Sequence, residues 1–467
     1  MPHSFSVGVI QKPTSAIHWR LSLAALLAAI LAACASDEPT PELPSADLVV
    51  RNANGYTMAD GELTRFSTLV VTDGRVVARG DKALASEFAA DAELDLGGKT
   101  LLPGLIDAHG HVSSLGRLRA SLDLAGIESL ASTLNRVDSY VKAQPEGSTG
   151  WVLGVGWNQV LWTEQRFPTA ADLDRIEAER PVYLNRIDGH AAWGNTAALR
   201  AAGIDDLTPD PEGGQIVRDK SGKATGVLID TAMRLVSNII PPPDRQQVKS
   251  DLREAMRELA SLGVTGVHDA GVSTLEVELY QELADENAMA IRASAMLGGV
   301  PTLDDFEGPI IGYADDRFEV TSVKLYADGA LGSRGAAMIK PYSDDPGNTG
   351  LMRGTLEDFT EQISAAHAKG FAANVHAIGD RANRLILDAF AAASDGKPSG
   401  LNDRIEHAQI VALEDIPRFA ELDIWASMQP THATSDKNMA EFRVGPRRIL
   451  GSYAWRRMLA AGVRVAA

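Results

Sequence analysis

Short apolar runs alternate with helix-like stretches along most of the chain, and this alternation constrains the fold more than any other feature. The helix-like stretch 251–263, DLREAMRELASLG, carries apolar residues at helical spacing and ends at Gly263. Eight runs have the length and composition of strands: 101–109, 264–271, 291–297, 321–329, 371–379, 403–408, 423–430 and 463–467. Eight strands that alternate with helices predict a parallel (β/α)8 TIM-like barrel over residues 101–467.

Two further segments complete the predicted α/β organisation. Residues 46–100 alternate short β-rich runs with turns, and Asp73-Gly74 between two valine-rich runs is typical of a hairpin. This small β-sandwich domain has too little apolar sequence to stand alone, so we expect it to be partial, with strands supplied from elsewhere in the chain. The long gap at about 112–250 predicts an insertion after the first barrel strand, on the catalytic side, that covers the substrate.

The N-terminal segment has the pattern of a secretory signal. Lys12 and Arg20 precede an apolar run, Leu21–Ala33, that is too short to span a bilayer. The chain's only cysteine, Cys34, follows directly, and Leu31-Ala32-Ala33-Cys34 resembles the lipobox of bacterial lipoproteins. An ordinary signal peptide with an incidental cysteine is the alternative interpretation.

The lipobox resemblance implies a location in the cell. Residues 1–33 would be the signal peptide, Cys34 would carry lipid that anchors the protein to a membrane, and 34–45 would be a flexible proline-rich tether. Ala35 is not aspartate, which favours the outer membrane of a Gram-negative envelope, facing the periplasm.

Composition excludes some partners. The formal net charge is −18 and the sequence pI about 5.0, so the surface repels nucleic acid and gives no charge-driven attraction to anionic lipid. A single cysteine excludes an intrachain disulfide. No sequence feature fixes the oligomeric state.

Histidines gather at the expected carboxyl ends of the strands, where barrel enzymes build their active sites. His109 and His111 close the first run, and side chains at i and i+2 of a strand point to the same face. His268, His376 and His407 lie near the ends of three other runs. Because neutral imidazole binds zinc and similar ions well, the pattern predicts a metal site. For His268 a purely structural role is an equal alternative.

Lys324 lies inside the fourth run, where an unpaired charge is costly. Carboxylation by CO₂ would convert it into an anionic oxygen ligand able to bridge two metal ions. Alternatively, its ammonium group reaches solvent at the barrel mouth. The spacing does not choose between the two.

Eight segments in sequence order resemble the amidohydrolase superfamily, and within it the branch of amidohydrolase family 3 related to N-substituted formamide deformylases. They are LLPGLIDAHGHV, GWNQVLWTEQRFPTAADLD, DGHAAWGNTAAL, GVTGVHDAG, VKLYADGALGSRGAA, VHAIGDRAN, RIEHAQIV and MQPTHATSDKNMAEFRVGP. The resemblance implies that His109 and His111 bind the more buried metal ion, that Lys324 is carboxylated and bridges the metals, and that His376 and His407 are further ligands.

The resemblance also implies contacts to the substrate from the insertion. His190 in DGHAAW matches a segment that approaches the substrate, and packing beside Trp193 is the alternative. His268 or His190 would donate a hydrogen bond to the developing oxyanion. Trp157, Trp162 and Trp193 would form an apolar wall of the pocket, or belong to the core of the insertion.

The sequence departs from the family pattern at its end. The family has an aspartate just after the eighth strand, which binds metal and shuttles the proton, whereas the run GVRVAA ends this chain at Ala467. The family's C-terminal strands of the small β-domain are also missing. We therefore expect a fragment of a longer protein, truncated in the eighth barrel unit and inactive as it stands.

The implied activity is hydrolysis of an amide-like C–N bond in a small molecule by a metal-activated water, with one or two divalent ions and zinc as the favoured metal. Two alternatives stay open. The same site would serve esters, lactones or cyclic amides, because fold and ligands do not fix the substrate. A non-catalytic envelope lipoprotein that binds a small molecule or a metal is the other.

Overall fold

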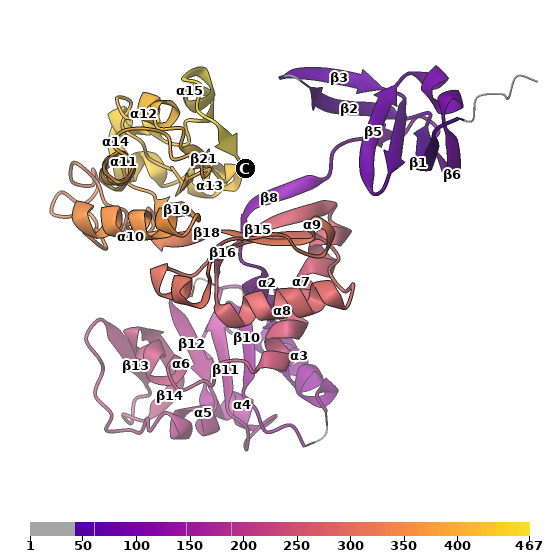
Figure 1. Cartoon of the computed structure of the whole chain (residues 1–467). Helices are drawn as coiled ribbons and strands as arrows, with labels where there is room; N and C mark the ends of the chain where they lie inside the picture. The colour runs from indigo at the N-terminus through magenta and orange to yellow at the C-terminus, as the bar shows by residue number, and fades with distance from the viewer. Residues whose placement is uncertain (1–42, 60, 146, 188) are drawn as a thin grey trace, which may run out of the picture. The chain divides into compact units, whose positions relative to one another are not determined.

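The computed structural model describes residues 43–467 apart from 60, 146 and 188 (Figure 1). Cys34, the signal run and nearly all of the tether lie outside these residues. The chain divides into a first unit that ends at Pro103 and a second unit, Gly104–Ala467. Within the described residues, no helix has the length and apolar character needed to cross a membrane.

The first unit consists of two small β-sheets. One has the strand order β5-β4-β1-β6 and the other β3-β2-β7. Their bounds are β1 Ser45–Arg51, β2 Asn54–Ala59, β3 Glu62–Phe66, β4 Thr68–Thr72, β5 Arg75–Gly80, η1 Lys82–Glu87, β6 Ala89–Asp95 and β7 Thr100–Leu101. The expected hairpin joins β4 to β5, and both of its turn residues, Asp73 and Gly74, have positive φ as a two-residue turn of this hand requires. That strands from elsewhere complete this unit stays a prediction.

The second unit contains the predicted barrel. Eight parallel strands follow one another in chain order around it: β8 Leu105–Gly110, β15 Val264–Val272, β16 Arg292–Leu297, β18 Phe318–Tyr326, β19 Ala372–Ala377, β20 Arg404–His407, β21 Trp425–Ser427 and β22 Val465–Ala466. Each overlaps one of the eight expected runs. The Ala108 amide donates to the Ala467 carbonyl at 3.3 Å, which nearly closes the ring between the last and first strands. The (β/α)8 prediction is therefore confirmed.

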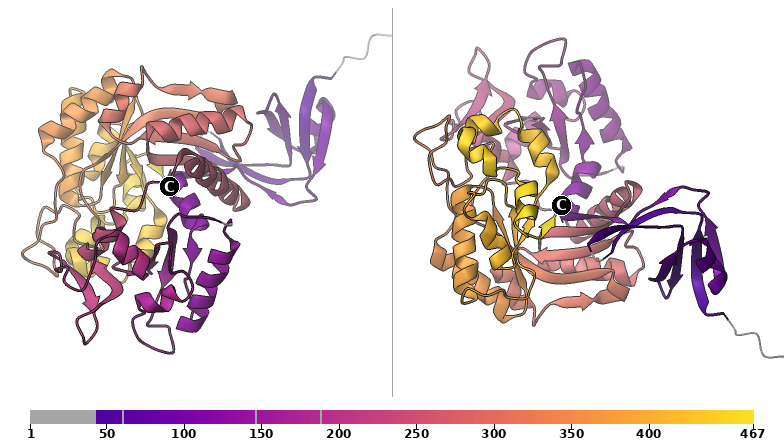
Figure 2. Two further views of the ribbon diagram at one scale, coloured as in Figure 1. Left: turned by 90° about the horizontal axis from the view of Figure 1, so that it is seen from below. Right: turned by 90° about the horizontal axis from the view of Figure 1, so that it is seen from above.

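Helices surround the barrel strands (Figure 2). They are α7 Arg245–Ser261, α8 Thr274–Asp285, α9 Tyr313–Asp316, α10 Leu356–Ala368, α11 Asp380–Ala393, α12 Ile416–Glu421, α13 Pro430–Asp436, α14 Ala440–Arg448 and α15 Trp455–Ala460, with η3 Val300–Asp305, η4 Ile449–Gly451 and the edge strand β17 Ile310–Gly312. The expected helix stop is present, since α7 is followed by Gly263 with φ +86°. Capping boxes begin α8 and α10, which satisfies their first backbone amides.

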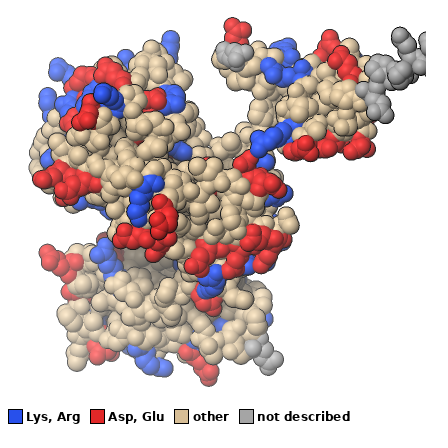
Figure 3. Space-filling model, viewed as in Figure 1, with Lys and Arg blue, Asp and Glu red and all other residues tan. Residues whose placement is uncertain are grey.

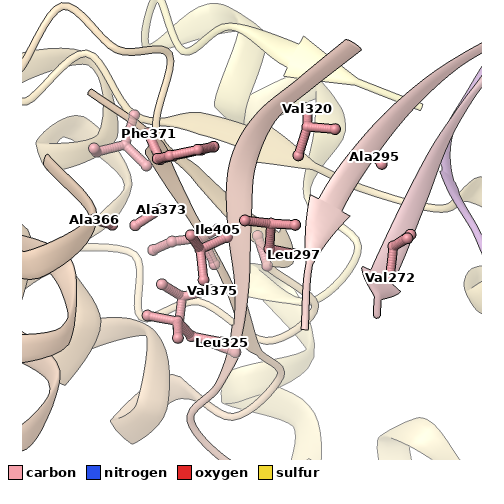
Figure 4. Packing of buried hydrophobic residues seen from close by; sticks show 14 of the residues in the cluster. Val272, Ala295, Leu297, Val320, Leu325, Ala366, Phe371, Ala373, Val375 and Ile405 are labelled. Carbon is pink, nitrogen blue, oxygen red and sulfur yellow. The ribbon is translucent and has the colours of Figure 1, made fainter. Parts of the chain in front are cut away.

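Alternation along the strands separates the core from the barrel interior. Val375 of β19 and Ile405 of β20 point outward into the apolar cluster between strands and helices (Figure 4). The neighbouring residues, such as Asn374 and Glu406, therefore point to the opposite face, into the barrel. Outward residues supply packing, and inward residues supply polar and charged groups.

The insertion between β8 and β15 forms its own six-stranded sheet, in the order β13-β14-β12-β11-β10-β9. Its elements are α2 Val112–Ala120, β9 Leu122–Asp123, α3 Leu130–Ala143, β10 Val152–Trp157, α4 Ala170–Asp174, β11 Val182–Arg186, β12 Ala191–Gly194, α5 Thr196–Ala201, β13 Gly214–Arg218, β14 Ala224–Asp230, η2 Thr231–Met233 and α6 Arg234–Ser237. Helix α2 packs against α7, where Gly116 leaves no room for a side chain beside the backbone of Asp251.

Candidate metal centre

The structure brings the five predicted metal ligands together at the carboxyl ends of their strands. The rings of His109 and His111 have centroids 5.4 Å apart, and those of His109 and His407 are 4.7 Å apart. His376 lies 4.7 Å from His407 by the same measure. Lys324 reaches into the group from β18, with its Nζ 3.2 Å from His109 Nε2. One cluster therefore contains side chains from β8, β18, β19 and β20 and from His111, the residue directly before α2.

Oxygen acceptors hold three of the imidazoles through Nδ1. They are Glu406 Oε2 at 2.6 Å from His109, the Ala270 carbonyl at 2.9 Å from His111, and Gln429 Oε1 at 2.6 Å from His407. An Nδ1–H that donates to oxygen leaves Nε2 with a free lone pair, which is the arrangement found in histidines that bind metals.

His376 has a buried nitrogen without a partner. Its Nε2 lies 3.3 Å from Asp328 Oδ1 but forms no hydrogen bond with any of the residues described. The Asp328 carboxylate is already engaged, since it accepts the amides of Ala337, Ile378 and Gly379. An orphaned buried nitrogen costs free energy unless something binds it.

This donor set fits a divalent metal ion. Within residues 43–467 as described, no three His, Cys, Asp or Glu side chains already converge closely enough to hold an ion as they stand. The imidazoles nevertheless share one site, hydrogen bonds orient three of them, and His376 Nε2 makes no hydrogen bond with any described residue. Nitrogen donors of this kind suit zinc and similar ions.

Burial also favours the uncharged forms that bind metals. Burial lowers the pKa of Lys324 to about 8, although the charge of Glu406 opposes this. Burial lowers the pKa of His111, and of His407 well below its ordinary value, and neighbouring positive groups add to the effect. Both imidazoles are therefore neutral near pH 7.

The backbone is strained where β20 ends. His407 and Ala408 have φ of +75° and +40°, in the left-handed region that residues other than glycine rarely adopt. Such conformations cost about 1–3 kcal/mol each and gather at functional sites. His407, one of the cluster's imidazoles, is among the strained residues.

Comparison with known proteins agrees with this site. A model described as the amidohydrolase family matches residues 92–467. The chain belongs to the amidohydrolase family. Its metal-dependent relatives include an uncharacterized metal-dependent hydrolase from Pyrococcus furiosus, whose structure matches with a TM-score of 0.74 at 29% identity, covering 90% of this chain and 84% of that one.

Two curated relatives also match most of this amidohydrolase chain. The putative amidohydrolase YtcJ of Bacillus subtilis (strain 168) is 32% identical over 421 residues, which cover 87% of this chain and 77% of that protein. The N-substituted formamide deformylase of Arthrobacter pascens is 30% identical over 438 residues, covering 90% of this chain and 79% of the relative.

His268 of the amidohydrolase barrel lies beside Arg404. Its Nδ1 accepts a hydrogen bond from Arg404 Nη2 at 2.6 Å, and burial together with the Arg404 charge lowers its pKa to about 4. Both side chains line a cavity of about 590 Å³ that also includes Glu319, Asn374 and Trp425. The contact with Arg404 favours the structural role left open for His268, and its oxyanion role stays a prediction.

The candidates in the insertion have two different environments. The His190 side chain is 74% exposed and its Nδ1 lies 2.8 Å from Asp230 Oδ1. Trp157 and Trp193 are fully buried in the core of the insertion beside Trp162, and each donates its indole N–H to a backbone carbonyl. This position is that of core residues, the second of the two roles that the sequence left open.

Several residues around the cluster were missed in the sequence. Glu406 and Gln429 hold ligands, His432 has its ring 5.5 Å from that of His407, and Tyr326 has its ring 5.8 Å from that of His376. A carboxylate directly before His407 in the predicted strand 403–408 was a signal for Glu406. Gln429 and His432 both lie in the segment MQPTH, which resembles the family as a whole segment, so the resemblance gives no role to either residue alone.

Proposed function

We propose that this protein is a metal-dependent hydrolase that cleaves amide-like C–N bonds in small molecules. The observation that carries the proposal is the convergence of four imidazoles and Lys324 at the catalytic end of the barrel. Family membership supports it, and so does the similarity to an N-substituted formamide deformylase.

The histidines and Lys324 of the cluster would have different roles. His109, His111, His376 and His407 would hold one or two divalent ions, zinc being the favoured metal, through their ring nitrogens. Lys324 would join them once its Nζ has lost its charge or carries a carboxyl group, and burial favours the loss of charge. A bound ion lowers the pKa of a water ligand and polarises a carbonyl oxygen.

Neighbouring side chains are placed to contact the substrate. Tyr326 is half-exposed beside His376, with the guanidinium of Arg353 5.8 Å from its ring centroid. His432 lies on the other side, next to His407. We propose that these groups orient the substrate over the cluster.

Metal analysis tests the site. Purified full-length protein is expected to carry close to one or two zinc-like ions per chain, and His109→Ala to lose them. His367→Ala is the matched control, because His367 is a half-buried histidine bonded to Asp403 at 2.9 Å, away from the cluster. Absence of bound metal from a well-folded wild type would contradict the proposal.

A substrate panel tests the bond that is cleaved. N-substituted formamides, other amides, esters, lactones and cyclic amides are offered to the full-length protein and to its His376→Ala variant. Turnover of amides that is lost in the variant supports the proposal. Turnover confined to esters or lactones would show that the site hydrolyses those bonds instead. Tight binding of a small molecule without turnover by the metal-loaded protein would favour the non-catalytic alternative.

A further inference from the structure

Glu406 is a fully buried carboxylate that contacts one of the cluster's imidazoles. It lies on β20 between Ile405, which packs outward, and His407, and its own side chain points into the barrel with an exposed fraction of 0%. Its Oε2 lies 2.6 Å from His109 Nδ1, so strands β20 and β8 are joined across the interior at this point.

Packing does not account for a carboxylate at this position. Barrel interiors are usually filled by branched apolar side chains, and a buried ion pair seldom stabilises a fold more than apolar residues of the same volume. Glu406 Oε1 makes no hydrogen bond with any described residue, so this oxygen is buried without a donor. The charges of Lys324 and Arg404 act on the carboxylate from nearby.

The contact with His109 fixes the proton on that imidazole. An ionised carboxylate can only accept, so Nδ1 carries the hydrogen and Nε2 carries the lone pair. The same hydrogen bond sets the orientation of the ring, and Nε2 then points to Lys324, into the cluster.

We infer that Glu406 is a positioning residue, which acts through His109 to present a basic, correctly oriented Nε2 to a divalent metal ion. A carboxylate behind a metal-binding histidine raises the basicity of the ring, and its removal typically weakens metal binding by about 10–100-fold. The inference rests on the proposed function only in that the cluster binds a metal; it is independent of the substrate.

The other two held imidazoles show why Glu406 differs. His111 donates to the carbonyl of Ala270 and His407 to the amide oxygen of Gln429, and both acceptors are neutral. A charged acceptor makes a hydrogen bond about twice as strong as a neutral one. Among these three imidazoles, His109 is the one held by charge.

The test measures metal affinity in Glu406→Gln, which keeps the shape and an acceptor but removes the charge. Competition between the full-length protein and a chelator for Zn²⁺ is expected to show about 10–100-fold weaker binding. The visible absorption of the Co²⁺-loaded variant is expected to change, which a purely structural substitution would not cause. Asp403→Asn is the matched control, a buried carboxylate bonded to His367 outside the cluster, with affinity expected within about 3-fold of wild type.

A double-mutant cycle shows whether Glu406 acts through His109. In a His109→Gln background, Glu406→Gln is expected to cause no further loss of affinity. A loss of the same size in both backgrounds would overturn the inference, as would a Glu406→Gln variant that binds Zn²⁺ as tightly as wild type.

One measurement needs neither metal nor the variant. Histidine ¹⁵N chemical shifts of the metal-free wild type are expected to show the proton of His109 on Nδ1. A proton on Nε2 would overturn the inference even if Glu406→Gln failed to fold. Failure of the wild type to bind metal, with the proton still on Nδ1, would instead contradict the proposed function and leave the positioning of the ring intact.

Discussion

At the scale of single residues, the metal centre depends on the atoms behind the ligands as much as on the ligands. Gln429 and Glu406 occupy equivalent positions behind His407 and His109, with the same 2.6 Å separation. They differ in charge. This pair allows the contribution of charge to be separated from that of ring orientation.

Gln429→Leu is expected to weaken Zn²⁺ binding, but by less than Glu406→Gln does. The leucine removes the acceptor of His407 Nδ1, so the ring is free to turn, yet no buried charge disappears with it. We expect a loss of up to about 10-fold, the lower end of the range for such partners. The same chelator competition measures it, and a loss larger than that of Glu406→Gln would contradict the ranking by charge.

The sequence predicted the metal-binding histidines but not the side chains that hydrogen-bond to them. His109, His376 and His407 follow or end apolar runs, and the rule that barrel strands expose their carboxyl ends was sufficient to place them together. Glu406 acts across the barrel on His109 of β8, and Gln429 acts on His407 of the neighbouring strand β20. Such pairs depend on the register between strands, which local sequence does not contain.

At the scale of elements, regular alternation and turn chemistry predicted what they govern locally. The hairpin at Asp73-Gly74, the end of α7 at Gly263 and the eight barrel strands all follow from short-range patterns. The sheet of the insertion does not. Its strand β12, AAWG, is short and fully buried without alternation. It pairs with β14, from which α5 and β13 separate it in the sequence.

The tryptophans of the insertion give a prediction for this sheet. Trp193→Phe removes the indole N–H that donates to the Thr169 carbonyl at 2.8 Å and leaves a small cavity beside Trp157 and Trp162. We expect the free energy of unfolding to fall by about 1–3 kcal/mol, with metal content unchanged. Denaturant unfolding measures this. Unchanged stability with weaker substrate binding would instead favour the pocket-wall role.

Helices α7 and α8 give a prediction on pH. Glu282 of α8 pairs with Arg245 and Lys249 of α7, and these hydrogen bonds lower the pKa of its carboxyl to about 2 from an ordinary 4.5. In the view of Figure 3, mainly acidic side chains lie over α8. A carboxyl with a lowered pKa stabilises the fold above its unfolded value, and the contribution disappears as the pH falls from 4.5 through about 2.

Glu282→Gln is therefore expected to lower the melting temperature near neutral pH and at low salt, and to make less difference as the pH approaches 2 or as salt screens the pairs. Thermal melts across this pH range measure it. Glu254→Gln is the matched control, since Glu254 is also exposed but pairs with Arg257 of its own helix. A difference in melting temperature between wild type and Glu282→Gln that grows toward low pH would contradict a stabilising role for the ionised Glu282 carboxylate.

At the scale of the whole molecule, the acidic surface limits how the protein can associate with a membrane. The net charge of −18 gives no attraction to an anionic membrane surface, so any association with a membrane has to come from a hydrophobic group. The sequence provides one candidate, Cys34, directly after the apolar run Leu21–Ala33. This part of the chain lies outside the described residues, so lipidation stays a prediction.

Cys34→Ser decides it. If Cys34 carries lipid, wild-type protein expressed in a Gram-negative host incorporates a radiolabelled fatty acid and sediments with the outer membrane. The reason is that each CH₂ group of an acyl chain that is buried in the bilayer contributes about 0.8 kcal/mol to membrane binding. The variant is expected to lose the label and to leave that fraction. His109→Ala, which alters the metal centre alone, is the control and is expected to keep both. A wild type that is cut after Ala33 without taking up label, and that is recovered in the aqueous periplasmic fraction, would instead establish an ordinary signal peptide.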